Sequence, residues 1–116
     1  MNDFLIYAAG GLGMIIAVVH GYIGEVKVVA PVTGINRSAK RVLSAVMFLS
    51  AIYWFAAGAL LVVAPLILES DAKRLAAFFV GTIYLSGALA NFWATRGRHF
   101  GWMLLAIATA LAWLGA

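Results

Sequence analysis

The segment between residues 42 and 68 reads VLSAVMFLSAIYWFAAGALLVVAPLIL, and no charged residue interrupts it. A helix needs roughly 20 mostly apolar residues to cross the hydrocarbon core of a bilayer, which is about 30 Å thick. This segment meets that requirement, and Lys40 and Arg41 stand directly before it. It therefore predicts a membrane-spanning helix.

The composition of the whole chain favours the same class of protein. Of its 116 residues, 66% are hydrophobic and only 10% are charged, and the mean hydropathy is +1.05. A soluble domain carries about 25% charged residues, because its surface has to face water. The chain has no cysteine, which excludes disulfides and thiolate metal sites.

Three further apolar segments accompany the one quoted above. The expected helices cover residues 4–24, 42–68, 75–94 and 100–116, within a single transmembrane domain over residues 1–116. The first is expected to be retained rather than cleaved as a signal peptide, because no basic residue precedes it. Ser70 or Asp71 is expected to cap the third helix, and Gly97 to end it. Short connections make neighbouring helices antiparallel, so the sequence predicts an all-α fold, an integral membrane up-down-up-down four-helix bundle.

Loop charges predict the direction of these helices, since Lys and Arg concentrate on the cytoplasmic side of a membrane. The side that holds the first and third connections carries six basic residues: Lys27, Arg37, Lys40, Arg41, Arg96 and Arg98. The other side carries Lys73 and Arg74 only. Both termini are therefore expected on the non-cytoplasmic side. The net charge of +4 favours contact with membrane lipid, including anionic headgroups, over nucleic acid, because the basic residues flank apolar segments.

Small residues recur at helical spacing in three of the expected helices. Helices in lipid associate through close packing, and small side chains let their backbones approach. The residues expected at these packing faces are Gly13, Ala17, Gly21, Ala51, Gly58 and Gly87. They predict a tight bundle.

Four polar residues are expected in one layer beneath the cytoplasmic surface: His20, Glu25, Ser44 and Asn91. Polar groups inside a membrane need partners and frequently mark function. In one interpretation they form a small pocket, or a proton or ion step, around His20 with Glu25 at its mouth. In the other, His20 is a structural residue that fixes helix register through a hydrogen bond to Asn91, Ser44 or a backbone carbonyl.

Metal, cofactor and catalytic sites have little support in the sequence. His20 and His99 are expected at different depths, and no third ligand accompanies them. No paired carboxylates, nucleophile with base, or phosphate-binding loop is evident, so no metal, cofactor or catalytic residue is assigned. The sequence favours a protein that is not an enzyme, with action on lipid as a weaker option.

The end of the first helix resembles a family of small, uncharacterised bacterial four-helix inner-membrane proteins. The resemblance rests on His20-Gly21-Tyr22-Ile23-Gly24-Glu25, which is similar to the family's His-(Gly/Ser)-x-(Leu/Ile)-Gly-Glu motif, and on Trp54 in the second helix. It covers the first two helices and implies a bacterial inner-membrane location. Met47 and Phe48 stand where the family has Trp-His, which argues against a site of two histidines.

Two functions follow as expectations. The first is association through helix packing, as a homo-oligomer or as an accessory subunit of a membrane complex. The alternative is a small channel or transporter for a proton, ion or small solute, formed by an oligomer, with the polar layer around His20 on its path.

Overall fold

The computed structural model describes all 116 residues and contains four α-helices and no strand, so the predicted all-α fold is confirmed. The helices are α1 (Asp3–Ile23), α2 (Arg37–Ile67), α3 (Ser70–Thr95) and α4 (Gly101–Gly115). A π-helix, η1 (Gly24–Val29), prolongs α1. In it the backbone N–H of Ala30 donates to the carbonyl oxygen of Glu25 at 2.9 Å.

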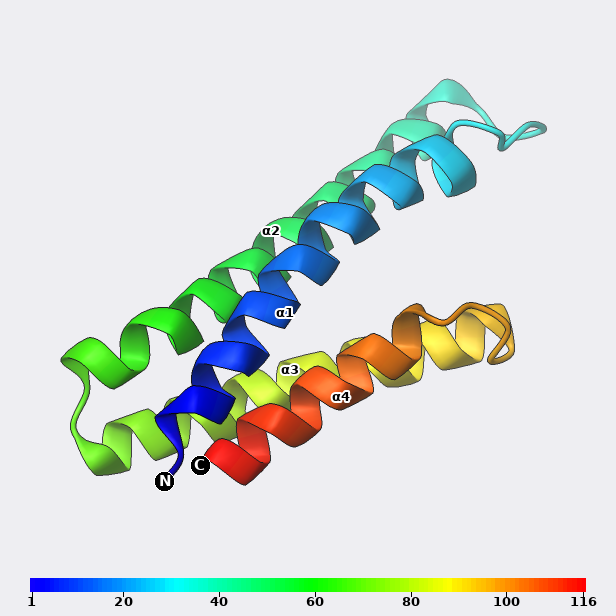
Figure 1. Ribbon diagram of the computed structural model, residues 1–116. Helices are drawn as coiled ribbons and strands as arrows, with labels where there is room; N and C mark the ends of the chain where they lie inside the picture. The colour runs from blue at the N-terminus through cyan, green and yellow to red at the C-terminus, as the bar shows by residue number, and fades with distance from the viewer.

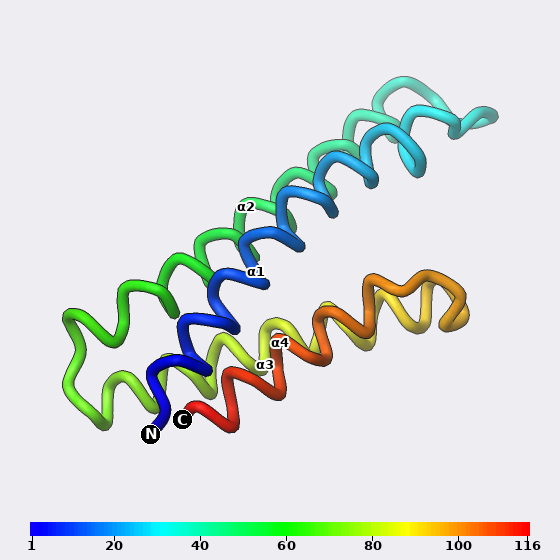
Figure 2. The backbone as a smooth tube through the Cα atoms, viewed as in Figure 1, coloured from blue at the N-terminus to red at the C-terminus, as the bar shows by residue number.

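The helices form two antiparallel hairpins that together make a V (Figure 1). α1 and η1 pack along α2, and α3 packs along α4. Figures 1 and 2 show the hairpins converging where both termini and the α2–α3 turn lie, which we call the closed end. They diverge toward the other two connections, which we call the open end. The expected four-helix bundle is therefore splayed, and α2 and α3 contact each other far less than α1 contacts α4.

Several helices extend beyond the ranges expected from the sequence. α1 with η1 continues to residue 29 instead of 24, α2 begins at residue 37 instead of 42, and α3 begins at residue 70 instead of 75. Hydropathy detects the apolar part of a helix, but the polar residues of its ends are equally compatible with helical backbone. The start of α2 is fixed by Asn36, whose side-chain oxygen accepts from the N–H of Ala39 at 2.7 Å.

The caps of α3 were predicted with mixed success. Neither Ser70 nor Asp71 is its N-cap, because that position belongs to Glu69, whose side chain makes no capping hydrogen bond. Asp71 still lies in the first turn, where a carboxylate is stabilised by the helix dipole. The predicted helix end at Gly97 is confirmed: its φ is 73°, it follows Arg96 at φ 52°, and its N–H donates to the Phe92 carbonyl at 2.8 Å.

The core lies where the four helices converge. Its largest fully buried side chains are Ile6, Leu61, Val80, Tyr84 and Leu105. The six small residues predicted to pack all lie at contacts between helices or against a large core side chain: Gly13, Ala17, Gly21, Ala51, Gly58 and Gly87. The backbones of α1 and α2 also approach closely, since a Cβ added to Gly58 would lie 2.6 Å from the carbonyl oxygen of Gly10.

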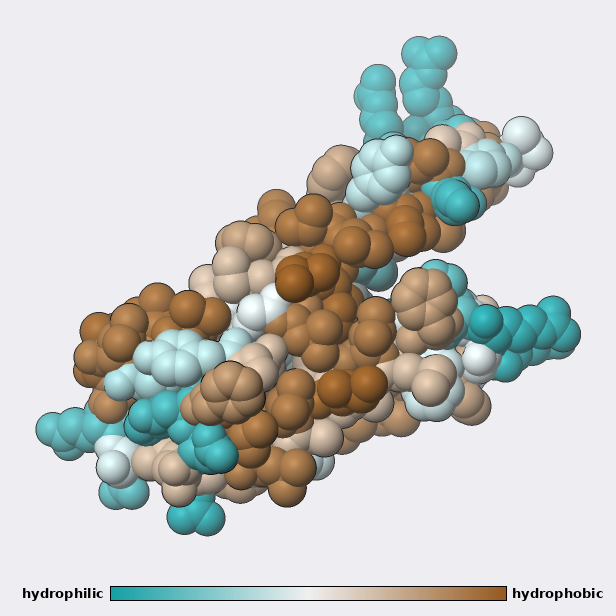
Figure 3. Space-filling model, viewed as in Figure 1, coloured by the Kyte–Doolittle hydropathy of each residue, from teal (hydrophilic) through white to brown (hydrophobic).

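The outer faces of the helices expose large apolar side chains. Phe4, Leu66, Leu75 and Trp93 are each at least 71% exposed. Figure 3 shows apolar residues over the middle of the visible face and hydrophilic residues toward its ends. Three helical segments are long and apolar enough to cross a membrane: Asp3–Val29, Arg37–Ile67 and Ser70–Thr95. α4 has 15 residues, which at 1.5 Å per residue reach about 22 Å, less than the hydrocarbon thickness of about 30 Å.

Candidate binding cleft

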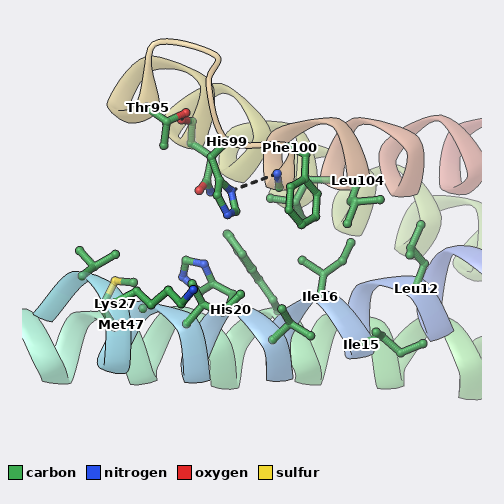
Figure 4. A pocket seen from close by; sticks show the side chains of 18 residues that line it. Leu12, Ile15, Ile16, His20, Lys27, Met47, Thr95, His99, Phe100 and Leu104 are labelled. Carbon is green, nitrogen blue, oxygen red and sulfur yellow. Dashed lines mark hydrogen bonds between the residues drawn. The ribbon is translucent and has the colours of Figure 1, made fainter. Parts of the chain in front are cut away.

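A cleft of about 740 Å³ lies between the two hairpins, and the space-filling view is hollowed between them where they diverge toward the open end (Figure 3). This volume falls within the range of about 300–1,000 Å³ that is typical of ligand pockets. One wall belongs to α1, η1 and α2, and the other to α3, α4 and the loop between them. Figure 4 shows the two walls facing each other, with His20 and Lys27 on one and Thr95, His99 and Phe100 on the other.

One face of α1 lines the cleft from its floor to its mouth. Leu12, Ile16, His20 and Lys27 follow one another along this face at spacings of four, four and seven residues. Residues so spaced share a face of a helix. The face is apolar near the core, becomes polar at His20 and carries a charge at Lys27. The cleft is therefore amphipathic along its length.

His20 is held against α2 by one hydrogen bond and one ring contact. Its Nε2 lies 3.1 Å from the hydroxyl oxygen of Ser50, and the Ser50 hydroxyl donates its proton to the carbonyl of Met47 at 2.8 Å. Because a hydroxyl has one proton, the Ser50 oxygen accepts from His20, which assigns the neutral ring's proton to Nε2. The ring also packs on Trp54, with centroids 4.4 Å apart.

Glu25 and Ser44 form a separate pair outside this cleft. The Ser44 hydroxyl donates to Glu25 Oε2 at 2.6 Å, which joins η1 to α2. Glu25 lies two residues before Lys27, and residues so spaced do not share a helix face. The four residues of the expected polar layer therefore do not meet in one pocket. Glu25 is not at the mouth of a pocket around His20, and Ser44 is not the partner of His20.

Asn91 lines the same cleft as His20 but on the opposite hairpin. Its amide nitrogen donates to the carbonyl of Gly87, one turn earlier in α3, at 3.0 Å. The suggested hydrogen bond between Asn91 and His20 is not formed. Thr95 lies one turn further toward the mouth, and its hydroxyl donates to the carbonyl of Asn91 at 2.7 Å. These two residues make the polar part of the second wall.

The sequence interpretation missed four residues of this region: Lys27, Ser50, Thr95 and His99. His99 was set aside as lying at a different depth, yet it lines the same cleft as His20 (Figure 4). Its Nδ1 accepts from the N–H of Gly101 at 3.1 Å, so the neutral ring carries its proton on Nε2. The sequence signal for Lys27 was its spacing of seven from His20, which keeps both on one helix face.

The closed end is sealed by contacts between distant parts of the chain. Lys73 Nζ and Asp3 Oδ1 form the only salt bridge of the structure, at 2.6 Å. The N–H of Asn2 donates to the carbonyl of Gly115 at 2.9 Å, which joins the two terminal segments. Together with the buried side chains of the core, these contacts close the space between the hairpins at this end.

A comparison of the chain with protein-family models, with curated proteins and with solved structures finds no match in any of the three.

The hydrogen bond between His20 and Ser50 predicts a distinct pattern in two variants. His20→Gln should keep most of the stability, because an amide N–H can still donate to Ser50. His20→Leu should lower the free energy of unfolding by about 1 kcal/mol, the size of interhelical hydrogen bonds in membrane helix bundles. Ser50→Ala is the matched control: because both changes remove the same bond, the double variant should be no less stable than His20→Leu alone. Thermal unfolding in mild detergent measures this, and additive losses would contradict it.

Proposed function

We propose that the protein is a non-enzymatic integral membrane protein that acts by association with other membrane components. It works as a homo-oligomer or as an accessory subunit of a larger membrane complex. The observation that supports this is the exposure of large apolar side chains along the outer faces of three long helices. Apolar patches of this extent are typical of surfaces that contact lipid or protein. The resemblance of the first helix favours the bacterial inner membrane.

The charge distribution supports an orientation with both termini on the non-cytoplasmic side. The open end holds six basic side chains and one carboxylate, that of Glu25, whereas the closed end holds two basic side chains and three carboxylates, those of Asp3, Glu69 and Asp71. Because Lys and Arg concentrate on the cytoplasmic side, the open end and its cleft face the cytoplasm. α4 is too short to cross alone, so it ends near the outer interface or is accommodated by local thinning of the bilayer.

The alternative, a channel or transporter, has less support. The cleft ends at the core, where Ile6, Tyr84 and Leu105 are fully buried. A single chain therefore offers no path between the two faces of a membrane. Transport through an oligomer with His20 on the path would give proton flux in liposomes that changes between about pH 5.5 and about pH 7.5. We expect no such flux. A proton flux that the unchanged protein shows and that both His20→Gln and His20→Leu abolish would favour the alternative.

Native mass spectrometry of the particle extracted in mild detergent tests the association itself. We expect a mass above that of one chain, in multiples of 12.3 kDa for a homo-oligomer or with an additional foreign subunit for an accessory role. Repeating the measurement after dilution separates stable association from crowding in the micelle. A bare monomer at every dilution, in both detergent and lipid nanodiscs, would contradict the proposal.

A further inference from the structure

The mouth of the cleft carries positive charge and no negative charge. Lys27 lines it on one wall and His99 on the other, and no acidic side chain lines any part of the cleft. Lys27 makes no salt bridge, since the only one joins Lys73 to Asp3 at the closed end. His99 uses Nδ1 to accept from Gly101, so its Nε2–H is the ring donor left for a ligand. These groups are suited to an anion.

The walls below the mouth are suited to a hydrocarbon chain. Leu12, Ile15 and Ile16 line the cleft on α1, and Leu104 and Leu105 line it on α4. Trp54 closes the floor on the α2 side and is only 8% exposed. A ligand that satisfies both regions has an anionic head and an apolar tail.

We propose that the cleft binds an anionic phospholipid, with its phosphate between Lys27 and His99 and an acyl chain along the apolar walls. Asn91 and Thr95 add polar side chains to the wall formed by α3, which suits the ester groups of the glycerol backbone of such a lipid. The proposal rests on the membrane location proposed above. Anionic lipids are abundant in the cytoplasmic leaflet, which is the leaflet that the open end reaches in the proposed orientation.

A second copy of the chain fits the cleft less well. An inserted helix would have to bring a carboxylate to the level of Lys27 and His99. Asp3, Glu69 and Asp71 all lie at the closed end, and Glu25 is bound to Ser44 at 2.6 Å. A phospholipid supplies the missing negative charge together with the apolar chain.

Trp54 provides the readout, because it lies at the floor of the cleft and is shielded from lipid around the protein. In a variant with Trp93, Trp102 and Trp113 changed to Phe, Trp54 is the only tryptophan. Its fluorescence is measured in vesicles that contain phosphatidylglycerol or phosphatidylcholine with brominated acyl chains. We expect brominated phosphatidylglycerol to quench the fluorescence of Trp54 at a lower mole fraction than brominated phosphatidylcholine does. Lys27→Gln should weaken this preference about fivefold, since one cation near a membrane surface contributes about that factor. The matched control Arg74→Gln removes a cation at the closed end and should leave the preference unchanged.

Native mass spectrometry of the chain with all four tryptophans provides a second measurement that does not depend on the multiple variant. From vesicles with equal amounts of the two lipids, we expect retained phosphatidylglycerol, reduced about fivefold by Lys27→Gln and unchanged by Arg74→Gln. Equal quenching or equal retention of the two lipids would overturn the proposal, and so would equal losses in the two variants. Crosslinking between two copies through Leu104→Cys would assign the cleft to a second chain and also overturn it. Each of these outcomes would overturn lipid binding in the cleft and leave the proposed membrane location standing. Release of the chain from membranes by alkaline carbonate would overturn both lipid binding and the membrane location.

Discussion

Replacing Gly13 with leucine is expected to lower the free energy of unfolding by about 3 kcal/mol, the upper part of the range for overpacked cores. Gly13 lies in α1 directly against the Tyr84 ring of α3, so that a Cβ at this position would overlap the tyrosine hydroxyl. Tyr84 cannot move aside easily, because it is fully buried and its hydroxyl donates to the carbonyl of Trp54. The added side chain therefore has to separate the two hairpins at the closed end.

Gly11 provides the matched control for this variant. A Cβ added to Gly11 meets no atom within 4 Å, although the residue lies only two positions away in the same helix. Gly11→Leu should therefore leave the unfolding temperature in mild detergent nearly unchanged, while Gly13→Leu lowers it. Equal behaviour of the two variants would mean that α1 does not pack against Tyr84.

Replacing Trp54 with alanine is expected to have a similarly large effect, about 3 kcal/mol, which is typical for removing a buried tryptophan. Trp54 lies on α2 and joins both hairpins: its ring packs on His20, and a Cβ added to Gly87 of α3 would lie 2.6 Å from ring atom Cζ2. α2 and α3 make few other contacts. The variant should therefore loosen the connection between the hairpins as well as lower the unfolding temperature.

Trp93 is the corresponding control, because its side chain is 83% exposed, compared with 8% for Trp54. Trp93→Ala removes the same side chain from the outer face of α3 and should change the unfolding temperature little. A large loss in Trp93→Ala together with a small loss in Trp54→Ala would reverse the assignment of inner and outer faces.

The helices were predictable from the sequence because long apolar segments separated by polar residues are compatible with few structures other than helices. The small-residue faces were predictable for a similar reason, since helical spacing alone places Gly13, Ala17 and Gly21 on one side of α1. The extra length of α1 and α2 was not predictable from hydropathy. The π-helix at Gly24–Val29 has no signal in the apolar pattern.

The arrangement of the polar residues was less predictable than the helices. Depth in a membrane was used to group His20, Glu25, Ser44 and Asn91, but depth does not specify the direction in which a side chain points. Glu25 faces α2 and Asn91 faces the cleft. The partner of His20 is Ser50, which lies six residues from Ser44. The splay of the hairpins, which brings His99 to the cleft, depends on packing between helices that the sequence pattern does not encode.

Labelling of single cysteines in membrane vesicles tests most directly whether the helices cross a membrane with the open end in the cytoplasm. The chain has no cysteine, so Ser38→Cys at the open end and Ser70→Cys at the closed end each introduce a unique thiol at an exposed position. With a maleimide that does not cross membranes, we expect Ser38→Cys to react only in inside-out vesicles and Ser70→Cys only in right-side-out vesicles. Reaction of both thiols from the same side would contradict this account.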